Sequence, residues 1–362
     1  MQKSPSMVLF FGGTTPAETT RQYDRLRDIF PHADIVGCST AGEISGYDVT
    51  DTGGVAIAIH FEKTRVQMSS LLLGDTAGSY DAGKRLASAV NGEGLKGVIV
   101  ISDGNQVNGS DLVEGLRTQL GKEVFISGGL AGDGGKFQET GVCHNGPALP
   151  GNIAVIGLYG ESLQIGWGSV GGWNPFGPLR HITQSDSNVL YELDGKPALA
   201  LYKSYLGESA AALPGSALHF PIMIRPEGAN DQEGLVRTIL SLDEEKQSLT
   251  FAGNMPKGHT AQLMMASYES LIEGAASAAD HAAEAIPDQI LGDQLALMIS
   301  CVGRKIVLGS RIEDEVEAVA DAFPPDTFFA GYYSYGEISP QHQGFCELHN
   351  QTMTITYLAE KA

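Results

Sequence analysis

Two nine-residue stretches near opposite ends of the chain share one pattern, and this pattern decides how the fold is read. They are Gly37-Cys-Ser-Thr-Ala-Gly-Glu-Ile-Ser45 and Gly331-Tyr-Tyr-Ser-Tyr-Gly-Glu-Ile-Ser339. The common string is G-x4-G-E-I-S. In both places a strand-like run and a helix-like run that ends in Phe-Pro precede the string. We therefore predict an internal repeat of about 60 residues near both ends of the chain.

Outward from these strings, the elements of each unit follow from local patterns. In the first unit an apolar run at 7–11 precedes Thr15, Pro16 and Glu18, which fit a helix N-cap with Pro at its first position. In the last unit a strand-like run at 297–301 precedes helical spacing up to Phe323, with Ser310 as the expected N-cap.

A weaker copy of the unit lies in the middle of the chain. It reads as a strand at 97–101, a helix at 110–120 and a strand at 124–126. An Ala-rich helix is expected at 268–286, and a turn-rich connection at 171–178. The alternation predicts an α/β protein of two halves, built from repeated strand-helix-strand units. Long strand runs after each G-E string predict mixed, partly antiparallel sheets.

Composition excludes several classes of partner. The chain has 362 residues, with 23 Lys and Arg against 43 Asp and Glu, and therefore a formal net charge of -20. A phosphate backbone or an anionic membrane surface needs clustered cations, so we expect neither nucleic acid nor such a surface as partner. No run approaches the roughly 20 apolar residues of a membrane-spanning helix, so no membrane span is expected.

Cysteine usage points to a reducing compartment. The four cysteines are far apart and form no C-x-x-C pair, which argues against a zinc site and favours free thiols. The first apolar run has only five residues, too short for a secretory signal core. We therefore expect a cytoplasmic protein without a bound metal ion.

Signatures of catalysis are missing from the sequence. It contains no G-x4-G-K-[ST], H-E-x-x-H or G-x-S-x-G string. Cys38 could act as a nucleophile, and Glu43 and Glu337 as a carboxylate pair, but nothing in the sequence places a base beside Cys38. We predict a non-enzyme with no catalytic residue.

The best ligand-binding residues lie in the C-terminal half. Arg304 follows a strand end and could bind a carboxylate, or instead pair with Glu313 or Asp314. Glu337 could bind an ammonium group, or simply hold its turn. The remaining members would wall or orient a ligand, and they are Tyr333, Ser334, Tyr335, Gly336, Asn350 and Gln351.

A secondary candidate site gathers the matching residues of the first and middle units. Its members are Cys38, Gly42, Glu43, Asp103, Gly132 and Asp133. The alternative for the glycines Gly42 and Gly336 is a turn that requires positive φ. Asp103 could equally cap a turn.

Several of these motifs resemble those of FIST domain proteins. The stretches that carry the resemblance are Gly37–Glu43, Ser127–Asp133, Cys301–Arg304, Gly331–Ile338 and Leu348–Thr352. They occur in the family's order and cover nearly the whole chain. The resemblance implies a FIST N-terminal domain at 1–190 and a FIST C-terminal domain at 191–362.

The resemblance also implies a function. It suggests an intracellular sensor of a small ligand, an amino acid or related metabolite, which signals through a partner protein such as a histidine kinase. No cofactor is expected on this reading. The alternative is a haem-binding nitric oxide sensor, as in some stand-alone bacterial members, that regulates a separate histidine kinase or cyclic-dinucleotide enzyme. Non-covalent haem b would then need an axial ligand such as His349, His60, His144 or a cysteine thiolate.

Overall fold

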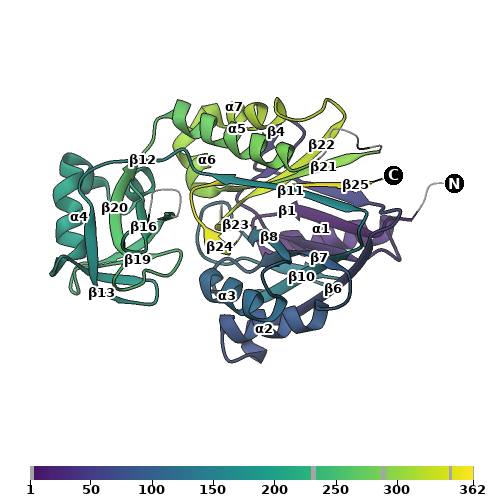
Figure 1. The fold of residues 1–362 in the computed structure, drawn as a ribbon, viewed down its shortest axis with the longest axis horizontal. Helices are drawn as coiled ribbons and strands as arrows, with labels where there is room; N and C mark the ends of the chain where they lie inside the picture. Colours follow the sequence, from purple (N-terminus) through teal and green to yellow (C-terminus); the bar gives the residue numbers. More distant parts are fainter. Residues whose placement is uncertain (1–3, 230–233, 287–289, 291, 342–344, 362) are drawn as a thin grey trace.

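The chain forms two lobes in a computed structural model that describes residues 4–229, 234–286, 290, 292–341 and 345–361 (Figure 1). We define the large lobe as the described parts of 4–173 and 266–361, and the small lobe as those of 174–265. The chain crosses between the lobes at 173–174 and again at 265–266. The first of these crossings lies within the turn-rich connection predicted at 171–178. The large lobe therefore contains both ends of the chain.

Three repeat units make up the large lobe, which confirms the predicted repeat and its weaker middle copy. Each unit is a pair of parallel strands joined by helix. The first unit has β1 (Met7–Gly12), α1 (Pro16–Ile29) and β2 (Ile35–Cys38). The middle unit has β7 (Leu95–Ser102), α3 (Gly109–Leu120) and β8 (Phe125–Leu130). The last has β21 (Gln294–Cys301), α6 (Val302–Leu308), η5 (Gly309–Arg311), α7 (Ile312–Ala320) and β22 (Thr327–Ser334).

One of the two predicted helix N-caps is present in the structure, and the other is not. Thr15 caps α1 by accepting the Glu18 backbone N–H at 3.2 Å, as expected. The expected Ser310 cap is wrong: residues 309–311 form a 3-10 turn, and α7 begins after Arg311 without a side-chain cap. Continuing the chain in a tight turn uses the backbone groups that a cap would have satisfied.

Each unit sends its next strand into the sheet of another unit. After β2, β3 (Glu43–Ser45) pairs with β22; after β22, β23 (Gly336–Pro340) pairs with β8; after β8, β9 (Val142–His144) pairs with β2. The three crossings close a ring, so the units are related by an approximate three-fold arrangement. The predicted α/β class with mixed sheets is confirmed.

Further strands extend the sheets at their edges. The first sheet adds β5 (Gly54–Ile59); the second adds β24 (Cys346–His349), β10 (Asn152–Tyr159) and β6 (Arg65–Leu72); the third adds β4 (Asp48–Thr50), β25 (Met353–Glu360) and β11 (Leu163–Val170). The inner faces meet in one core with side chains from all three sheets, where Phe11 stacks on Tyr332 at 4.6 Å between ring centroids.

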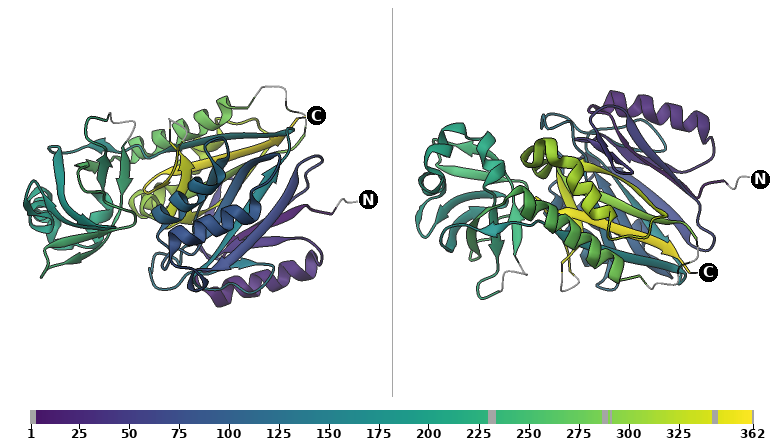
Figure 2. Two further views of the ribbon diagram at one scale, coloured as in Figure 1. Left: turned by 60° about the horizontal axis from the view of Figure 1, so that its bottom comes forward. Right: turned by 90° about the horizontal axis from the view of Figure 1, so that it is seen from above.

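Helices cover the outer faces of the sheets (Figure 2). α2 (Ser79–Val90), after η1 (Leu73–Asp75), lies beside α3, and α5 (Tyr268–Glu284) lies beside α7. The predicted Ala-rich helix is thus confirmed. Its small side chains face glycines of β11: a Cβ on Gly168 would run into the Ala278 carbonyl. Glycine opposite alanine lets the helix backbone approach the sheet closely.

The small lobe is a strand-rich insertion into the chain between the middle and last units. Its elements are β12 (Asn174–Pro175), β13 (Arg180–Asp186), β14 (Val189–Leu193), β15 (Lys196–Pro197), α4 (Ala198–Leu206), η2 (Gly207–Ala212), η3 (Gly215–His219), β16 (Ile222–Arg225), β17 (Leu235–Arg237), β18 (Ile239–Asp243), β19 (Ser248–Phe251) and β20 (Thr260–Met265). It has a core of its own around Tyr202 and Phe251. Across the described segments of both lobes, no helix is long and apolar enough to cross a membrane.

Candidate functional site

Arg304 is fully buried, and each of its three guanidinium nitrogens has a protein partner. Its Nε donates to Glu315 Oε1 at 2.7 Å, and Nη2 lies 2.6 Å from the same oxygen. The other donors go to backbone carbonyls, including Leu271 O at 2.8 Å and Gly171 O. The partner is thus Glu315, and neither Glu313 nor Asp314. With its donors used inside the fold, Arg304 has none left for a ligand carboxylate.

Glu337 is equally buried, at the start of β23. One carboxylate oxygen accepts from Ser334 at 2.6 Å, and the other accepts from the Thr352 hydroxyl at 3.0 Å. Burial raises the pKa of Glu337 to about 8, and these hydrogen bonds oppose the shift. Glu43 repeats this geometry in the first unit, where Thr40 donates at 2.6 Å, and burial raises its pKa too.

The glycines of the two strings differ in conformation. Gly42 has a φ of +131°, as the turn reading predicts. Gly336 lies within β23 outside the positive-φ region, so that reading is wrong for Gly336. A Cβ there would lie 3.0 Å from Leu348 Cδ1, so close side-chain packing explains this glycine instead.

The tyrosines around Glu337 do not line a common cavity wall. Tyr333 is fully buried and donates from its hydroxyl to Glu315 Oε2 at 3.2 Å. Tyr335 donates to Asp133, and its ring stacks on Phe137 at 4.3 Å between centroids. The two hydroxyls therefore belong to different polar clusters of the core.

The secondary candidates fix loops and junctions. Asp133 accepts four backbone N–H groups from residues 136–139. Burial raises its pKa, but the hydrogen bond from Tyr335 and these backbone bonds outweigh burial and hold the pKa low. Asp103 accepts from Thr140 at 2.7 Å and from two backbone N–H groups. Gly132 donates from its backbone N–H to Ser39 O at 3.0 Å, across two units. Cys38 is buried, and burial raises the pKa of its thiol.

Asn350 and Gln351 lie where the lobes meet. The Gln351 amide donates to Leu218 O of the small lobe at 3.4 Å, and Asn350 Oδ1 lies 3.5 Å from the Thr238 backbone nitrogen. Gln351 Oε1 and Thr238 Oγ1 are buried without a hydrogen-bond partner in the described structure. Buried polar atoms without a partner are uncommon in folded proteins, so these two atoms set the contact between the lobes apart.

His349 does not suit a haem bound through Nε2. That nitrogen lies 3.0 Å from the Ser339 carbonyl oxygen, which can only accept, so Nε2 carries the proton. An axial bond through Nε2 would break this contact. Burial lowers the pKa of His349 to about 4. Within the described residues, no group of three or more His, Cys, Asp or Glu could hold a metal ion.

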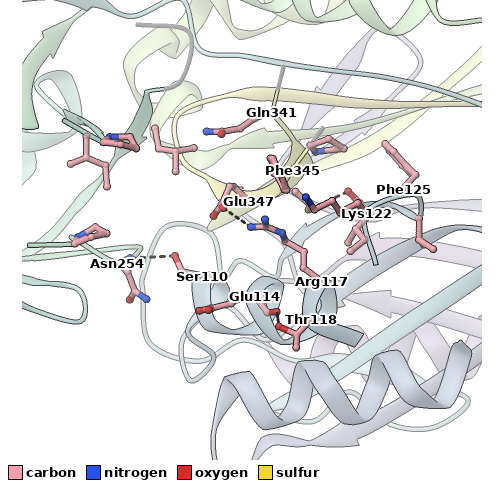
Figure 3. Close-up of a pocket in the computed structure, with 18 of the residues that line it drawn as sticks. Ser110, Glu114, Arg117, Thr118, Lys122, Phe125, Asn254, Gln341, Phe345 and Glu347 are labelled. Carbon is pink, nitrogen blue, oxygen red and sulfur yellow. Dashed lines mark hydrogen bonds and ion pairs between the residues drawn. The ribbon is translucent and has the colours of Figure 1, made fainter. Parts of the chain in front are cut away.

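A cleft of about 730 Å³ separates the two lobes beside the β23–β24 hairpin (Figure 3). Its large-lobe wall comes mainly from α3, residues 121–126 and β24, and its small-lobe wall from β16, β17 and residues 254–259. Ser110 and Asn254 hold the walls together at one end, where the Asn254 N–H donates to Ser110 Oγ at 3.2 Å.

An ion pair faces this cleft. Arg117 Nη1 donates to Glu347 Oε1 at 2.7 Å, with both side chains partly exposed. The Arg117 guanidinium lies 5.0 Å from the centre of the Phe345 ring, and the Lys122 ammonium lies 4.9 Å from it. Two cations thus lie near one aromatic ring, and the negative electrostatic potential over the face of such a ring attracts positive charge. Burial raises the pKa of Glu347, and Arg117 and Arg237 oppose that shift.

Arg237 brings a further cation to the floor of the cleft. It is almost fully buried, donates to the Leu348 carbonyl at 2.8 Å and to the Asn254 carbonyl at 3.3 Å. Burial lowers its pKa to about 10, which still leaves it charged at neutral pH. Its contacts join the small lobe to β24.

The charge of the cleft differs from that of the whole chain. Its lining has four cations, Arg117, Lys122, Arg225 and Arg237, against three carboxylates, Glu114, Glu123 and Glu347. The whole chain has 23 cations against 43 carboxylates. Among the described lining residues the formal charges thus nearly balance, whereas the whole chain has a net charge of -20.

Most of these residues were missed by sequence reasoning. They come from separate elements and form no local string, so only their spatial assembly identifies them. Glu347 was the nearest signal, because it opens the polar stretch that ends in Thr352.

Comparison of this chain with known proteins gives a distant relative in sequence and a weak structural match. An uncharacterized protein of Methanocaldococcus jannaschii is 23% identical over 355 residues, which cover 92% of this chain and 66% of that protein's length. The crystal structure of cyanuric acid hydrolase from A. caulinodans aligns with 83% of this chain and 100% of its own, at 12% identity and a TM-score of 0.19. A score of this size does not establish a shared fold.

Two family patterns together cover nearly the whole chain. The FIST N domain matches residues 6–196 and the FIST C domain matches residues 198–340. The small lobe contains the end of the first match and the beginning of the second. FIST domains are associated with sensing and signal transduction. The chain belongs to the FIST family.

Proposed function

We propose that this protein is a sensor that binds a small carboxylate-bearing metabolite, an amino acid or a relative of one, in the cleft between its lobes. The single observation that carries the proposal is the partly exposed Arg117–Glu347 pair beside Lys122 and Phe345. An arginine fork is suited to a carboxylate, and a glutamate accepts from an ammonium group. The cleft thus offers both halves of a zwitterion a partner.

Binding would proceed by exchange of ion pairs. Arg117 would turn from Glu347 to the ligand carboxylate, and Glu347 would take the ligand ammonium group. Because both partners are already partly exposed, the exchange uncovers no buried charge. The same exchange at Arg304 would leave Glu315 buried and unpaired, which is costly.

The lobes supply a route from ligand to signal. The cleft walls belong to different lobes, so a ligand that contacts both favours one lobe arrangement over another. The unpartnered atoms of Gln351 and Thr238 lie at this same interface, which supports a second arrangement in which they find partners. We place the output in a partner protein such as a histidine kinase, in the cytoplasm, and assign no catalytic step to this chain.

Isothermal titration calorimetry with a panel of amino acids tests this proposal. We expect at least one to bind, and Arg117→Gln to weaken it about tenfold or more, since hydrogen bonds between charged groups contribute about 1.5–3 kcal/mol. Arg311→Gln is the matched control, because Arg311 is also a partly exposed arginine, paired with Glu269 and Asp314 away from the cleft. Undiminished affinity in Arg117→Gln, or no binding anywhere in the panel, would contradict the proposal.

A further inference from the structure

A second cavity of about 470 Å³ adjoins the cleft, and aromatic, aliphatic and polar side chains line it. The polar ones are Ser169, His281, Glu284, Gln341, His349 and Thr352. Both tryptophans of the chain, Trp167 and Trp173, line it, together with Met223, Val236 and Met264. Glu284, an exposed residue near the end of α5, is the single carboxylate among its described lining residues. This cavity therefore differs from the cleft, which is lined by several ion-forming groups.

The two cavities meet under the β23–β24 hairpin. Trp167, Pro340 and Gln341 line both of them. Strand β17 separates them elsewhere: Leu235 and Arg237 line the cleft, and Val236 between them lines the second cavity. This follows from the alternation of side chains along a strand. Strand β17 thus presents Leu235 and the charged Arg237 to the cleft, and the apolar Val236 to the second cavity.

Contacts within the fold hold two of the rings that line the second cavity, Trp173 and His349. The Trp173 indole N–H donates to the Gln351 carbonyl at 3.0 Å, and a Cβ on Gly171 would lie 2.6 Å from Trp173 Cδ1. Because glycine has no Cβ, residue 171 leaves room for the indole ring of Trp173. His349 also lines this cavity, and its contact with the Ser339 carbonyl fixes the orientation of its imidazole ring.

We infer that the ligand is an amphipathic carboxylate, whose charged end binds at Arg117 and Lys122 and whose apolar group enters the tryptophan-lined cavity. This inference rests on the function proposed above and adds the class of side group. Ligands with an aliphatic or aromatic group of the size of a leucine or phenylalanine side chain would bind more tightly than ligands without such a group. Burial of each methylene group would tighten binding about fourfold.

A ligand series measured by calorimetry and tryptophan fluorescence tests the inference. Glycine, valine, leucine and phenylalanine vary the apolar group, with acetate and phenylacetate as counterparts that lack the ammonium group. Trp173 lines the second cavity and Trp167 lines both, so ligands that fill the second cavity should change the emission more than glycine and acetate do. We expect affinity to rise at least tenfold from glycine to leucine or phenylalanine.

Two variants that alter the cavity in opposite directions sharpen the test. Val236→Phe should abolish the gain for the larger ligands, and Met264→Ala should move the preference toward larger groups. Leu240→Phe is the control, since Leu240 is an exposed residue of the small lobe that lines neither cavity. The use of two variants keeps the test intact if one of them fails to fold.

The outcomes separate this inference from the proposed function. Affinity that depends on Arg117 but stays flat along the series would overturn the inference and leave the proposed function standing. Loss of all Arg117-dependent binding would overturn both. Both would be supported if affinity rises along the series, Val236→Phe abolishes that rise and Met264→Ala moves the preference toward larger groups.

Discussion

Two arginine–glutamate pairs of almost identical length occupy very different environments in this protein. Arg304 and Glu315 lie 2.6 Å apart with side chains 0% exposed, and Arg117 and Glu347 lie 2.7 Å apart with side chains 30% and 29% exposed. The buried pair is tied to Tyr333, Ser300 and three backbone carbonyls. The cleft pair has room for a ligand beside it. The comparison teaches that burial, and not residue chemistry, separates the structural pair from the pair proposed to bind a ligand.

The largest expected effect is on stability. Arg304→Ala should lower the free energy of unfolding by about 3–5 kcal/mol, because it leaves Glu315 buried without its partner. Arg117→Ala should cost less than about 1 kcal/mol, since its pair is partly exposed. Urea unfolding followed by circular dichroism measures both. Equal losses in the two variants would break the comparison.

The pH dependence of stability gives the next largest effect. The folded-state pKa of Glu337 is raised to about 8, so the folded protein holds its proton more tightly than the unfolded chain does. The stabilisation is fully present below the usual carboxyl range, near pH 4.5, and is lost as pH rises through about 8. Glu337→Gln cannot ionise, so we expect the difference in melting temperature between wild type and variant to change steadily from pH 5 to pH 8. A constant difference would show that Glu337 does not titrate in this range.

A smaller effect should distinguish the two ends of the ligand. Glu347→Gln removes the expected partner of the ammonium group and should weaken an amino acid several-fold, while its counterpart without the ammonium group binds unchanged or more tightly. Competition calorimetry with phenylalanine and phenylacetate provides the measurement. Equal weakening of both compounds would mean that Glu347 acts only by positioning Arg117.

The smallest expected effect concerns haem. Because His349 Nε2 bonds the Ser339 carbonyl, His349→Ala should leave the Soret absorbance of a hemin titration essentially unchanged. A saturable, stoichiometric band in wild type that disappears in this variant would contradict the geometry and restore the gas-sensor alternative.

Local patterns predicted the units of the fold but not their assembly. The Thr15 cap, the alternation of strands and helices, and the weak middle copy are recorded in short stretches of sequence. The ring of crossings depends on pairing between distant strands, such as β3 with β22, and no local pattern sets that register. The small lobe likewise has short strands without a repeat to mark it.

The candidate site shows the same limit from the side of function. The repeated string drew attention to Glu337, and the end of a predicted strand drew attention to Arg304. Both prove to be buried and hydrogen-bonded within the fold. The cleft residues Arg117, Arg237 and Glu347 come from α3, β17 and β24 and share no motif. Sequence shows which residue types are present, but exposure distinguishes a binding group from a structural one.

Hydrogen–deuterium exchange with and without the tightest-binding amino acid tests the central claim most directly. If the ligand binds in the cleft, protection should rise in peptides covering residues 109–126 and 345–349. Peptides covering residues 296–304 and 327–337, around the buried pair, should exchange as before. Ligand-induced protection around Arg304 and Glu337, with α3 unchanged, would contradict the account and return the site to the buried junction.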